Sequence, residues 1–173
     1  MDSSVIIEQM NRESRGTLMA SLGTEFTGIG EDWLEAKMPI DERTMRPGNL
    51  LHGGAIMALV ETVGSGLTYI GENLEENHVF GIEINANHVR KAQGKYVIGR
   101  AEFIHKGHRT HVVAVNVTDE FGNLASVGRI TNVYYRNHRM ESDKQGRDVE
   151  FLPCYNIISS YQSIYQVLPE SQC

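Results

Sequence analysis

The sequence predicts an α+β domain in which a curved antiparallel sheet wraps around one long buried helix. Three observations favour this fold class. One segment, 53–70, is strongly apolar with helical spacing, about six strand-like runs surround it in the sequence, and most of those runs come after it. A single buried helix needs a sheet to cover it, and turn residues between consecutive runs are typical of antiparallel strands.

Length and composition fit one domain with appendages. The chain has 173 residues, of which 40% are apolar, enough to bury a core. We expect an N-terminal helical segment at 1–20, the main domain at 21–136, and a charged linker followed by an amphipathic tail at 137–173.

Charge, hydropathy and cysteine use exclude several classes of protein. The formal net charge of -6 disfavours nonspecific binding to nucleic acid or to an anionic membrane surface. The first residues lack a cationic region followed by an apolar run, and no stretch approaches the roughly 20 apolar residues of a membrane span, so we expect a cytoplasmic protein without a membrane partner. Cys154 and Cys173 both lie in the tail, which leaves the main domain without a cysteine nucleophile or thiolate zinc site.

The N-terminal third predicts mixed elements. An irregular helix is expected at about 4–19, and strands at 22–26 and 33–38 joined by the turn-rich residues 27–32. The segment 39–49 is expected to be a loop.

The segment 53–70 predicts a helix that is apolar nearly all round and therefore buried. Its apolar residues that share one helical face are Ile56, Leu59, Val60, Val63 and Leu67.

The remaining strands form a predicted antiparallel meander. They are expected at 80–87, 96–104, 110–119 and 124–135, with turns at 93–95 and 120–123. In the tail, 139–150 is a predicted solvated linker, and apolar residues recur at helical spacing between 157 and 168.

Glu61 is the first candidate for chemistry. It is the sole charged residue between Gly53 and Gly71, and an unpaired carboxylate is costly to bury. Helical geometry puts Met57, Ser65 and Thr68 on its side, so Ser65 lies one turn away and can orient the carboxylate or a water molecule. The alternative is an interface or solvent-exposed glutamate.

The second candidate is the start of the same helix, at His52, Gly53 and Gly54. Two glycines let a substrate approach the unpaired N–H groups of the first turn, which can polarise a carbonyl. A Gly-Gly pair at a helix start also occurs as a simple packing feature.

The third candidate is a basic region between 89 and 111, where six Lys or Arg residues stand against Glu102 alone. A polyanionic ligand and ordinary solvated edge charges are about equally favoured by composition. There is no zinc motif, and His105, His108 and His111 lack clear carboxylate companions, so no metal site is expected.

Two motifs resemble a known family. The run 50–55, continued by 61–65, resembles the signature of hotdog-fold acyl-CoA thioesterases of the 4-hydroxybenzoyl-CoA and phenylacetic-acid-pathway type. The run 81–90 is similar to the bacterial 1,4-dihydroxy-2-naphthoyl-CoA hydrolases, and the resemblance extends from about 22 to 135.

The resemblance implies a hotdog fold, an acyl-CoA thioesterase without cofactor, and roles for named residues. Glu61 would be the base or nucleophile, Gly53 the backbone donor to the thioester carbonyl, His52 a helper near the carbonyl or sulfur, and Ser65 the residue that positions water. The residues implied to bind the acyl end are Arg46, Asn49, Gly54 and Thr62, and those implied to bind coenzyme A are His88, Arg90, His108 and Arg109.

The resemblance also implies a homodimer, commonly a dimer of dimers, with the His-Gly end and the glutamate of one site on different subunits. Arg46 departs from the family pattern, where Gln or Asn is usual, and a charged Arg either favours an acidic or hydroxylated acyl group or pairs with Glu61. The tail after 135 has no counterpart in compact family members.

Two further interpretations stay open. One is a proofreading thioesterase acting on acyl groups bound to a carrier protein, and the other is a non-catalytic acyl-CoA-binding module. An aromatic acyl-CoA, with 1,4-dihydroxy-2-naphthoyl-CoA first, is the favoured substrate.

Overall fold

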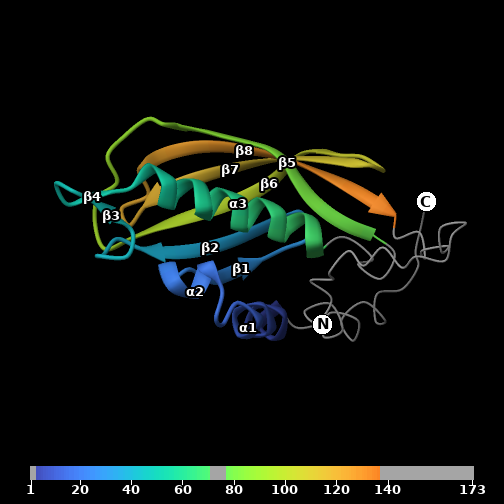
Figure 1. Ribbon diagram of the computed structural model, residues 1–173, viewed down its shortest axis with the longest axis horizontal. Coiled ribbons are helices and arrows are strands. Elements are labelled where there is room, and N and C mark those ends of the chain that lie inside the picture. The colour runs from blue at the N-terminus through green and yellow to red at the C-terminus, as the bar shows by residue number, and fades with distance from the viewer. Residues whose placement is uncertain (1–2, 71–76, 137–173) are drawn as a thin grey trace, which may run out of the picture.

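A six-stranded antiparallel sheet curls around one long helix in the computed structural model, which describes residues 3–70 and 77–136 (Figure 1). The sheet order is β1-β2-β6-β7-β8-β5, and α3 (Gly53–Ile70) lies in its concave face. The strands of this sheet are β1 (Glu25–Ile29), β2 (Trp33–Pro39), β5 (Asn77–His88), β6 (Tyr96–Lys106), β7 (Thr110–Asp119) and β8 (Leu124–Arg136). The predicted fold class is confirmed.

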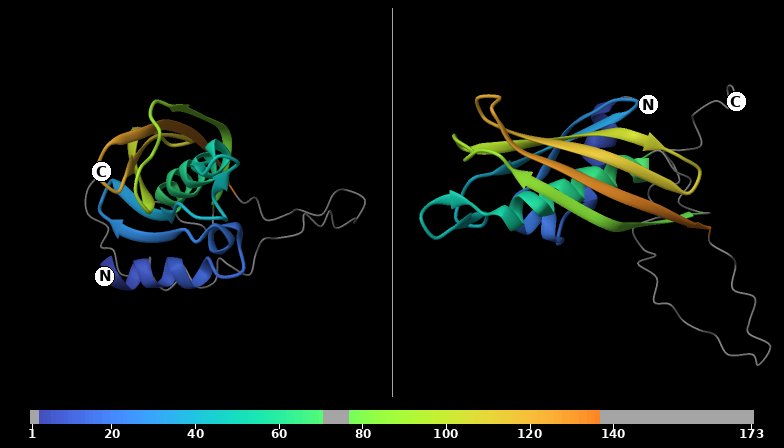
Figure 2. Two further views of the ribbon diagram at one scale, coloured as in Figure 1. Left: turned by 90° about the vertical axis from the view of Figure 1, so that its left-hand side faces the viewer. Right: turned by 90° about the horizontal axis from the view of Figure 1, so that it is seen from above.

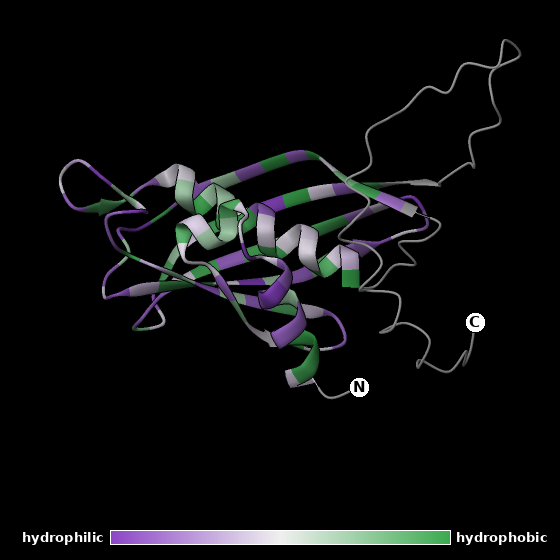
Figure 3. Cartoon of the chain, turned by 60° about the horizontal axis from the view of Figure 1, so that its bottom comes forward, coloured by the Kyte–Doolittle hydropathy of each residue, from purple (hydrophilic) through white to green (hydrophobic). Residues whose placement is uncertain are grey.

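The core lies between α3 and the inner face of the sheet. Along β7 the inner side chains Val113, Val115 and Val117 are fully buried and alternate with more exposed residues, as a half-covered strand requires. Figure 3 shows α3 in white and green against strands of mixed colour. Helix and sheet approach closely because Gly64 has no side chain: a β-carbon there would stand 2.3 Å from Ile130 Cγ2.

The N-terminal segment folds as two helices rather than one. Helix α1 (Ser3–Glu13) is followed by the short α2 (Leu18–Leu22), and both lie outside the sheet beside β1 (Figure 2). The side chain of Asn11 fixes α1 in place, since it accepts a hydrogen bond from the Phe26 N–H at 2.7 Å and donates one to the Phe26 carbonyl at 2.9 Å.

The first predicted strand, at 22–26, is wrong in its position. Gly23 takes a left-handed conformation (φ 68) that ends α2, so β1 begins only at Glu25. A glycine after an apolar run is the signal in the sequence for that stop.

The predicted loop at 39–49 contains the start of a small second sheet. Strands β3 (Met45–Arg46) and β4 (Leu50–Leu51) pair through a turn in which Gly48 (φ 90) and Asn49 (φ 54) both have left-handed backbones. A hydrogen bond from the His52 N–H to the Thr44 carbonyl (2.9 Å) then holds this turn against the start of α3.

Strand β5 is an edge of the large sheet, paired on one side with β8. Phe80 and Ile82 on this strand are 54% and 60% exposed. An open apolar edge of this kind is normally covered by another chain or segment. The predicted linker 139–150 and amphipathic tail lie outside the described residues.

Candidate functional site

Glu61 and Ser65 lie on consecutive turns of α3 and face the inward side of β8. The Ser65 hydroxyl donates a hydrogen bond to Glu61 Oε1 at 2.9 Å and lies 3.4 Å from Asn132 Oδ1 on β8. Both residues are half-buried, whereas Asn132 is fully buried. The predicted neighbourhood of Glu61 and Ser65 is therefore present, and Thr68 joins it through Asn132, which donates to Thr68 Oγ1 at 2.8 Å.

Glu61 lies beside Gly81, a residue of β5 without a side chain. A β-carbon on Gly81 would stand 3.0 Å from Glu61 Oε1, so the strand at this point leaves room for the carboxylate only because it carries a glycine. The pairing of β5 with β8 also shifts between Gly81 and Glu83, which marks a β-bulge beside the carboxylate.

His52 caps the start of α3. Its Nδ1 accepts a hydrogen bond from the Gly54 N–H at 2.8 Å, while its carbonyl accepts from the N–H groups of Ala55 and Ile56. Because Nδ1 is the acceptor, the proton of the neutral ring sits on Nε2, which is left as a donor. The Gly54 N–H is thus used by the cap, and among the described residues no partner is found for the Gly53 N–H.

His88 lies beside this helix start, which the sequence did not reveal. A β-carbon on Gly53 would stand 2.8 Å from His88 Nε2. The Ser126 hydroxyl lies 3.1 Å from both His88 Nδ1 and the Asn87 carbonyl, so it holds the His88 ring in place.

The two halves of the predicted catalytic set are apart within one chain. Gly53 and Glu61 are eight residues apart on a straight helix, which corresponds to about 12 Å along its axis. One thioester group is far too small to touch both ends.

The residues implied to bind the acyl end lie on two elements, the β3–β4 hairpin and α3. Arg46 and Asn49 are exposed on the β3–β4 hairpin, Gly54 is exposed in the first turn of α3, and Thr62 is half-buried beside Glu61. Arg46 donates to the carbonyl of its neighbour Pro47 at 3.2 Å, and no ion pair links it to Glu61 within the described residues.

The basic region is not one patch in a single chain. His88 and Arg90 follow the end of β5, whereas His108 and Arg109 lie in the β6–β7 turn at the opposite end of the sheet. Ser126 of β8 pairs with His88 on one side and with Val117 of β7 on the other. Val117 lies seven residues after Thr110, which corresponds to about 23 Å along β7. Within one chain these four residues therefore form two separate groups, and their binding of coenzyme A stays a prediction.

Two other cations of this region are bound to neighbours. Arg100 stacks on the Trp33 ring at 4.0 Å and pairs with Glu102 at 2.9 Å, while Lys106 lies 3.9 Å from Asp32. These contacts on the outer face of the sheet leave them less available to a ligand.

Asp119 ties the loop that carries Arg90 to the β7–β8 turn. Burial acts against the charged form, but N–H groups of Asn123, Phe121 and Gln93 donate to the carboxylate and hold the pKa of Asp119 below its usual value. Arg90 itself donates to Asn123 Oδ1 at 3.3 Å. The loop is thus fixed by the hairpin beside it.

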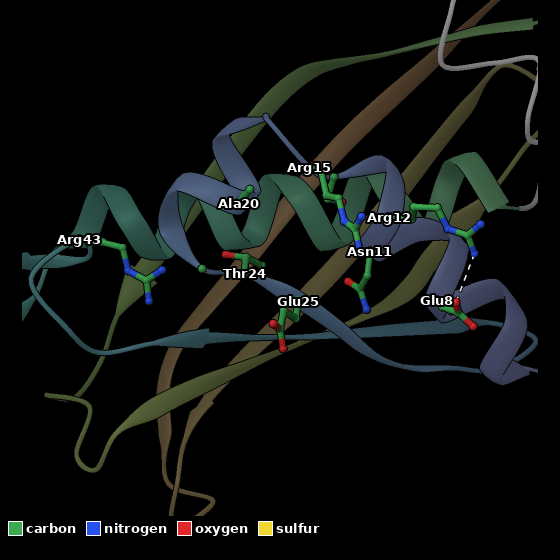
Figure 4. Close-up of a pocket in the computed structure, with 10 residues that line it drawn as sticks. Glu8, Asn11, Arg12, Arg15, Ala20, Thr24, Glu25 and Arg43 are labelled. Atoms are coloured by element: carbon green, nitrogen blue, oxygen red, sulfur yellow. Dashed lines mark hydrogen bonds and ion pairs between the residues drawn. The ribbon is translucent and has the colours of Figure 1, made fainter.

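A separate pocket of about 560 Å³ lies between α1, α2 and β1 (Figure 4). Two of the charged residues around it are already paired, Arg12 with Glu8 and Arg43 with Asp41. The Asn11 side chain is also occupied, by the backbone of Phe26. No cluster of metal-binding side chains is found within residues 3–70 and 77–136.

Sequence reasoning missed Asn132 and Ser126. Both lie on β8, where inward residues alternate with outward ones, and both are polar at inward positions. A polar residue on the inner face of a predicted strand was the available signal.

Comparison with known proteins shows the family of this chain. A family model described as "Thioesterase superfamily" matches residues 48–126. The 1,4-dihydroxy-2-naphthoyl-CoA hydrolase of Escherichia coli is 41% identical over 127 residues, which cover 73% of this chain and 93% of that protein. The proofreading thioesterase EntH of Cronobacter turicensis is 39% identical over 125 residues, or 72% of this chain and 90% of that protein.

Solved structures show the same arrangement of helix and sheet. The crystal structure of thioesterase HI1161 from Haemophilus influenzae superposes with a TM-score of 0.73 at 36% identity, covering 78% of this chain and 94% of that one.

Proposed function

The chain belongs to the thioesterase superfamily and has its hotdog fold, and from this premise we propose that it hydrolyses an aromatic acyl-CoA thioester to the free acid and coenzyme A. The observation that carries the proposal is the pair formed by Glu61 and the Ser65 hydroxyl at 2.9 Å, half-buried in the middle of the core helix. The similarity to known thioesterases supports the reaction class, and the substrate is our inference.

In the proposed reaction Glu61 removes a proton from a water molecule that Ser65 helps to orient. The water oxygen bonds to the thioester carbon. The Gly53 N–H and the Nε2–H of His52, both contributed by a second copy of the chain, stabilise the negative charge on the carbonyl oxygen. The carbon–sulfur bond then breaks, and the proton held by Glu61 passes to the sulfur of coenzyme A. The helix dipole adds to the stabilisation at Gly53, because its positive end lies there.

The proposal requires a dimer, and the exposed edge of β5 suggests how it forms. Along this edge Gly81 lies beside Glu61, and His88 lies beside Gly53. If two β5 strands pair in antiparallel fashion about a two-fold axis at Asn85, the β-bulge between Gly81 and Glu83 lets Gly81 of one strand lie opposite His88 of the other. Glu61 of each chain then faces the Gly53 end of its partner, giving two equivalent sites.

The same pairing reunites the two halves of the basic region. It places the partner's β6–β7 turn, with His108 and Arg109, at the end of the composite sheet where His88 and Arg90 lie. These groups would bind the phosphates of coenzyme A from two chains.

Arg46 bears on the choice of acyl group. It is exposed and uses one donor on the Pro47 carbonyl, so other donors of its guanidinium remain for a ligand. A hydroxylated aromatic acyl group offers matching acceptors, which favours 1,4-dihydroxy-2-naphthoyl-CoA or a similar ester. We place the enzyme in the cytoplasm, where acyl-CoA esters are available.

A second candidate function is hydrolysis of acyl groups carried on a carrier protein. The similarity to EntH, at 39% identity, is close to that to the CoA hydrolase and favours keeping this alternative. A carrier-bound substrate would present a protein surface in place of the nucleotide.

Thiol release from a panel of aroyl-, arylacetyl- and fatty-acyl-CoA esters and of the same acyl groups on a carrier protein tests the proposal, with wild type and Glu61→Gln side by side. We expect turnover of an aroyl-CoA that falls by a factor on the order of 10² to 10⁴ in the variant. Turnover of the carrier-bound esters alone would select the second candidate, and equal rates in wild type and variant would refute the role of Glu61.

A further inference from the structure

Asn132 on β8 is held in one orientation beneath the proposed site. It is fully buried, and its amide nitrogen donates to Thr68 Oγ1 at 2.8 Å and to the Gly64 carbonyl at 3.3 Å. A carbonyl oxygen can only accept, so the amide cannot be turned round without losing that bond. The amide oxygen, Oδ1, therefore faces Ser65.

The Ser65 hydroxyl has one hydrogen and two acceptors within reach. Glu61 Oε1 lies at 2.9 Å and Asn132 Oδ1 at 3.4 Å, so the hydrogen is directed mainly to the ionised carboxylate. When Glu61 takes a proton from water, its carboxyl group becomes a donor. Ser65 can accept that bond only if its own hydrogen turns to another acceptor, and Asn132 Oδ1 is placed to receive it.

We infer that Asn132 is a positioning residue for thioester hydrolysis, whose amide oxygen lets the Ser65 hydroxyl reverse its hydrogen bond with Glu61 when that carboxylate gains a proton. The inference rests on the proposed roles of Glu61 and Ser65. Asn132 touches neither water nor substrate in this scheme, and it acts through Ser65.

This role differs from that of a buried polar residue that only stabilises the fold. Loss of Oδ1 affects the step in which Glu61 is protonated and leaves the binding of substrate alone, so kcat should fall while KM changes little. Because Asn132 acts through Ser65, its removal should matter only where Ser65 is present.

The test is a double-mutant cycle with wild type, Asn132→Val, Ser65→Ala and the double variant, assayed for thiol release from the best acyl-CoA ester. We expect Asn132→Val to lower kcat on the order of tenfold with KM within about twofold, and to add nothing in the Ser65→Ala background. Thr24→Val is the control, because it removes a buried hydroxyl beside the separate pocket at α2 and β1, away from Glu61; its kcat should stay near that of wild type.

Melting temperatures show which variants are folded at the assay temperature. If Asn132→Val does not fold, Asn132→Ser, which is polar but too short to reach Ser65, replaces it in the cycle. Losses that add independently, or a matching loss in Thr24→Val, would overturn the inference. Wild-type turnover and its loss in Glu61→Gln are measured first, so that a failure of the proposed function is recognised separately.

Discussion

Gly81 and Glu61 lie in contact between the edge strand and the core helix, with room for a carboxylate oxygen but not for a further methyl group: a β-carbon on Gly81 would stand 3.0 Å from Glu61 Oε1. The Glu61 carboxylate is therefore held from one side by the strand backbone and from the other by the Ser65 hydroxyl. Its position depends on two separate elements of the fold.

Gly81→Ala is expected to lower kcat on the order of tenfold, because the added methyl group displaces the carboxylate by a few tenths of an ångström. Alanine suits a strand at least as well as glycine, so the melting temperature should change little. Steady-state kinetics and a thermal melt check both parts. An unaltered kcat would show that the carboxylate works from another position.

Mixing two inactive variants should restore activity if each site is shared between chains. Glu61→Gln and His52→Ala each lose a group from both sites of their own dimer, but a mixed dimer holds one site with both groups intact. Coexpression at equal levels should recover about a quarter of wild-type activity, since half of the dimers are mixed and each has one working site.

Size-exclusion chromatography of the mixture controls for assembly. Activity no higher than the mean of the two parents, in a sample that contains mixed dimers, would place Glu61 and His52 in the same chain's site.

Replacing Arg90 and Arg109 with Ala should raise KM for acyl-CoA esters and weaken its dependence on salt, because ions screen phosphate contacts. Each single variant is expected to raise KM, since in the proposed dimer both ends of the sheet contact one ligand. The control is Arg100→Ala, whose guanidinium is stacked on Trp33 and should leave KM unchanged. The measurement is KM at low and at high salt. The same dependence of KM on salt in Arg90→Ala and in wild type would contradict the role of Arg90 in binding coenzyme A.

His111 should make the folded state sensitive to acid. Burial, with nearby Lys106 and His105, lowers the pKa of His111 from 6.5 to about 4. The unfolded chain then binds this proton between about pH 6.5 and 4 while the folded chain does not, so stability falls as the pH falls through that window.

The expected loss from His111 at pH 4.5 relative to pH 7 is on the order of 2 kcal/mol. Urea unfolding of wild type and His111→Gln at both pH values measures it, because the variant lacks the titrating ring. An equal loss in both proteins would assign the acid sensitivity to other groups, of which the Asp119 carboxylate is one.

The local elements were largely predictable because their signals are local. The bounds of α3 agree with the predicted 53–70, and the later strands agree to within a few residues, since helical spacing, strand alternation and glycine turns lie within short stretches of sequence. The error at 22–26 arose where a short helix and a strand share an apolar run. Glycine conformation, and not composition, separates them.

The candidate site likewise contains local pairs that the sequence predicts and long-range contacts that it does not. Glu61 with Ser65, and His52 with its two glycines, could be paired from the sequence because each pair lies within one or two turns of a single helix. Asn132 and His88 could not be placed from spacing, because each reaches α3 from a strand far along the chain.

The sequence by itself determined the fold class, the core helix and the carboxylate on it, since these follow from periodicity and from one charge in an apolar helix. The tertiary structure alone decided that the basic region is split between two ends of the sheet, that His88 stands against Gly53, and that Gly53 and Glu61 of one chain are too far apart to act together. The physical reason is that distances between strands and along a straight helix are set by packing and hydrogen-bond register, which nearness in sequence does not encode.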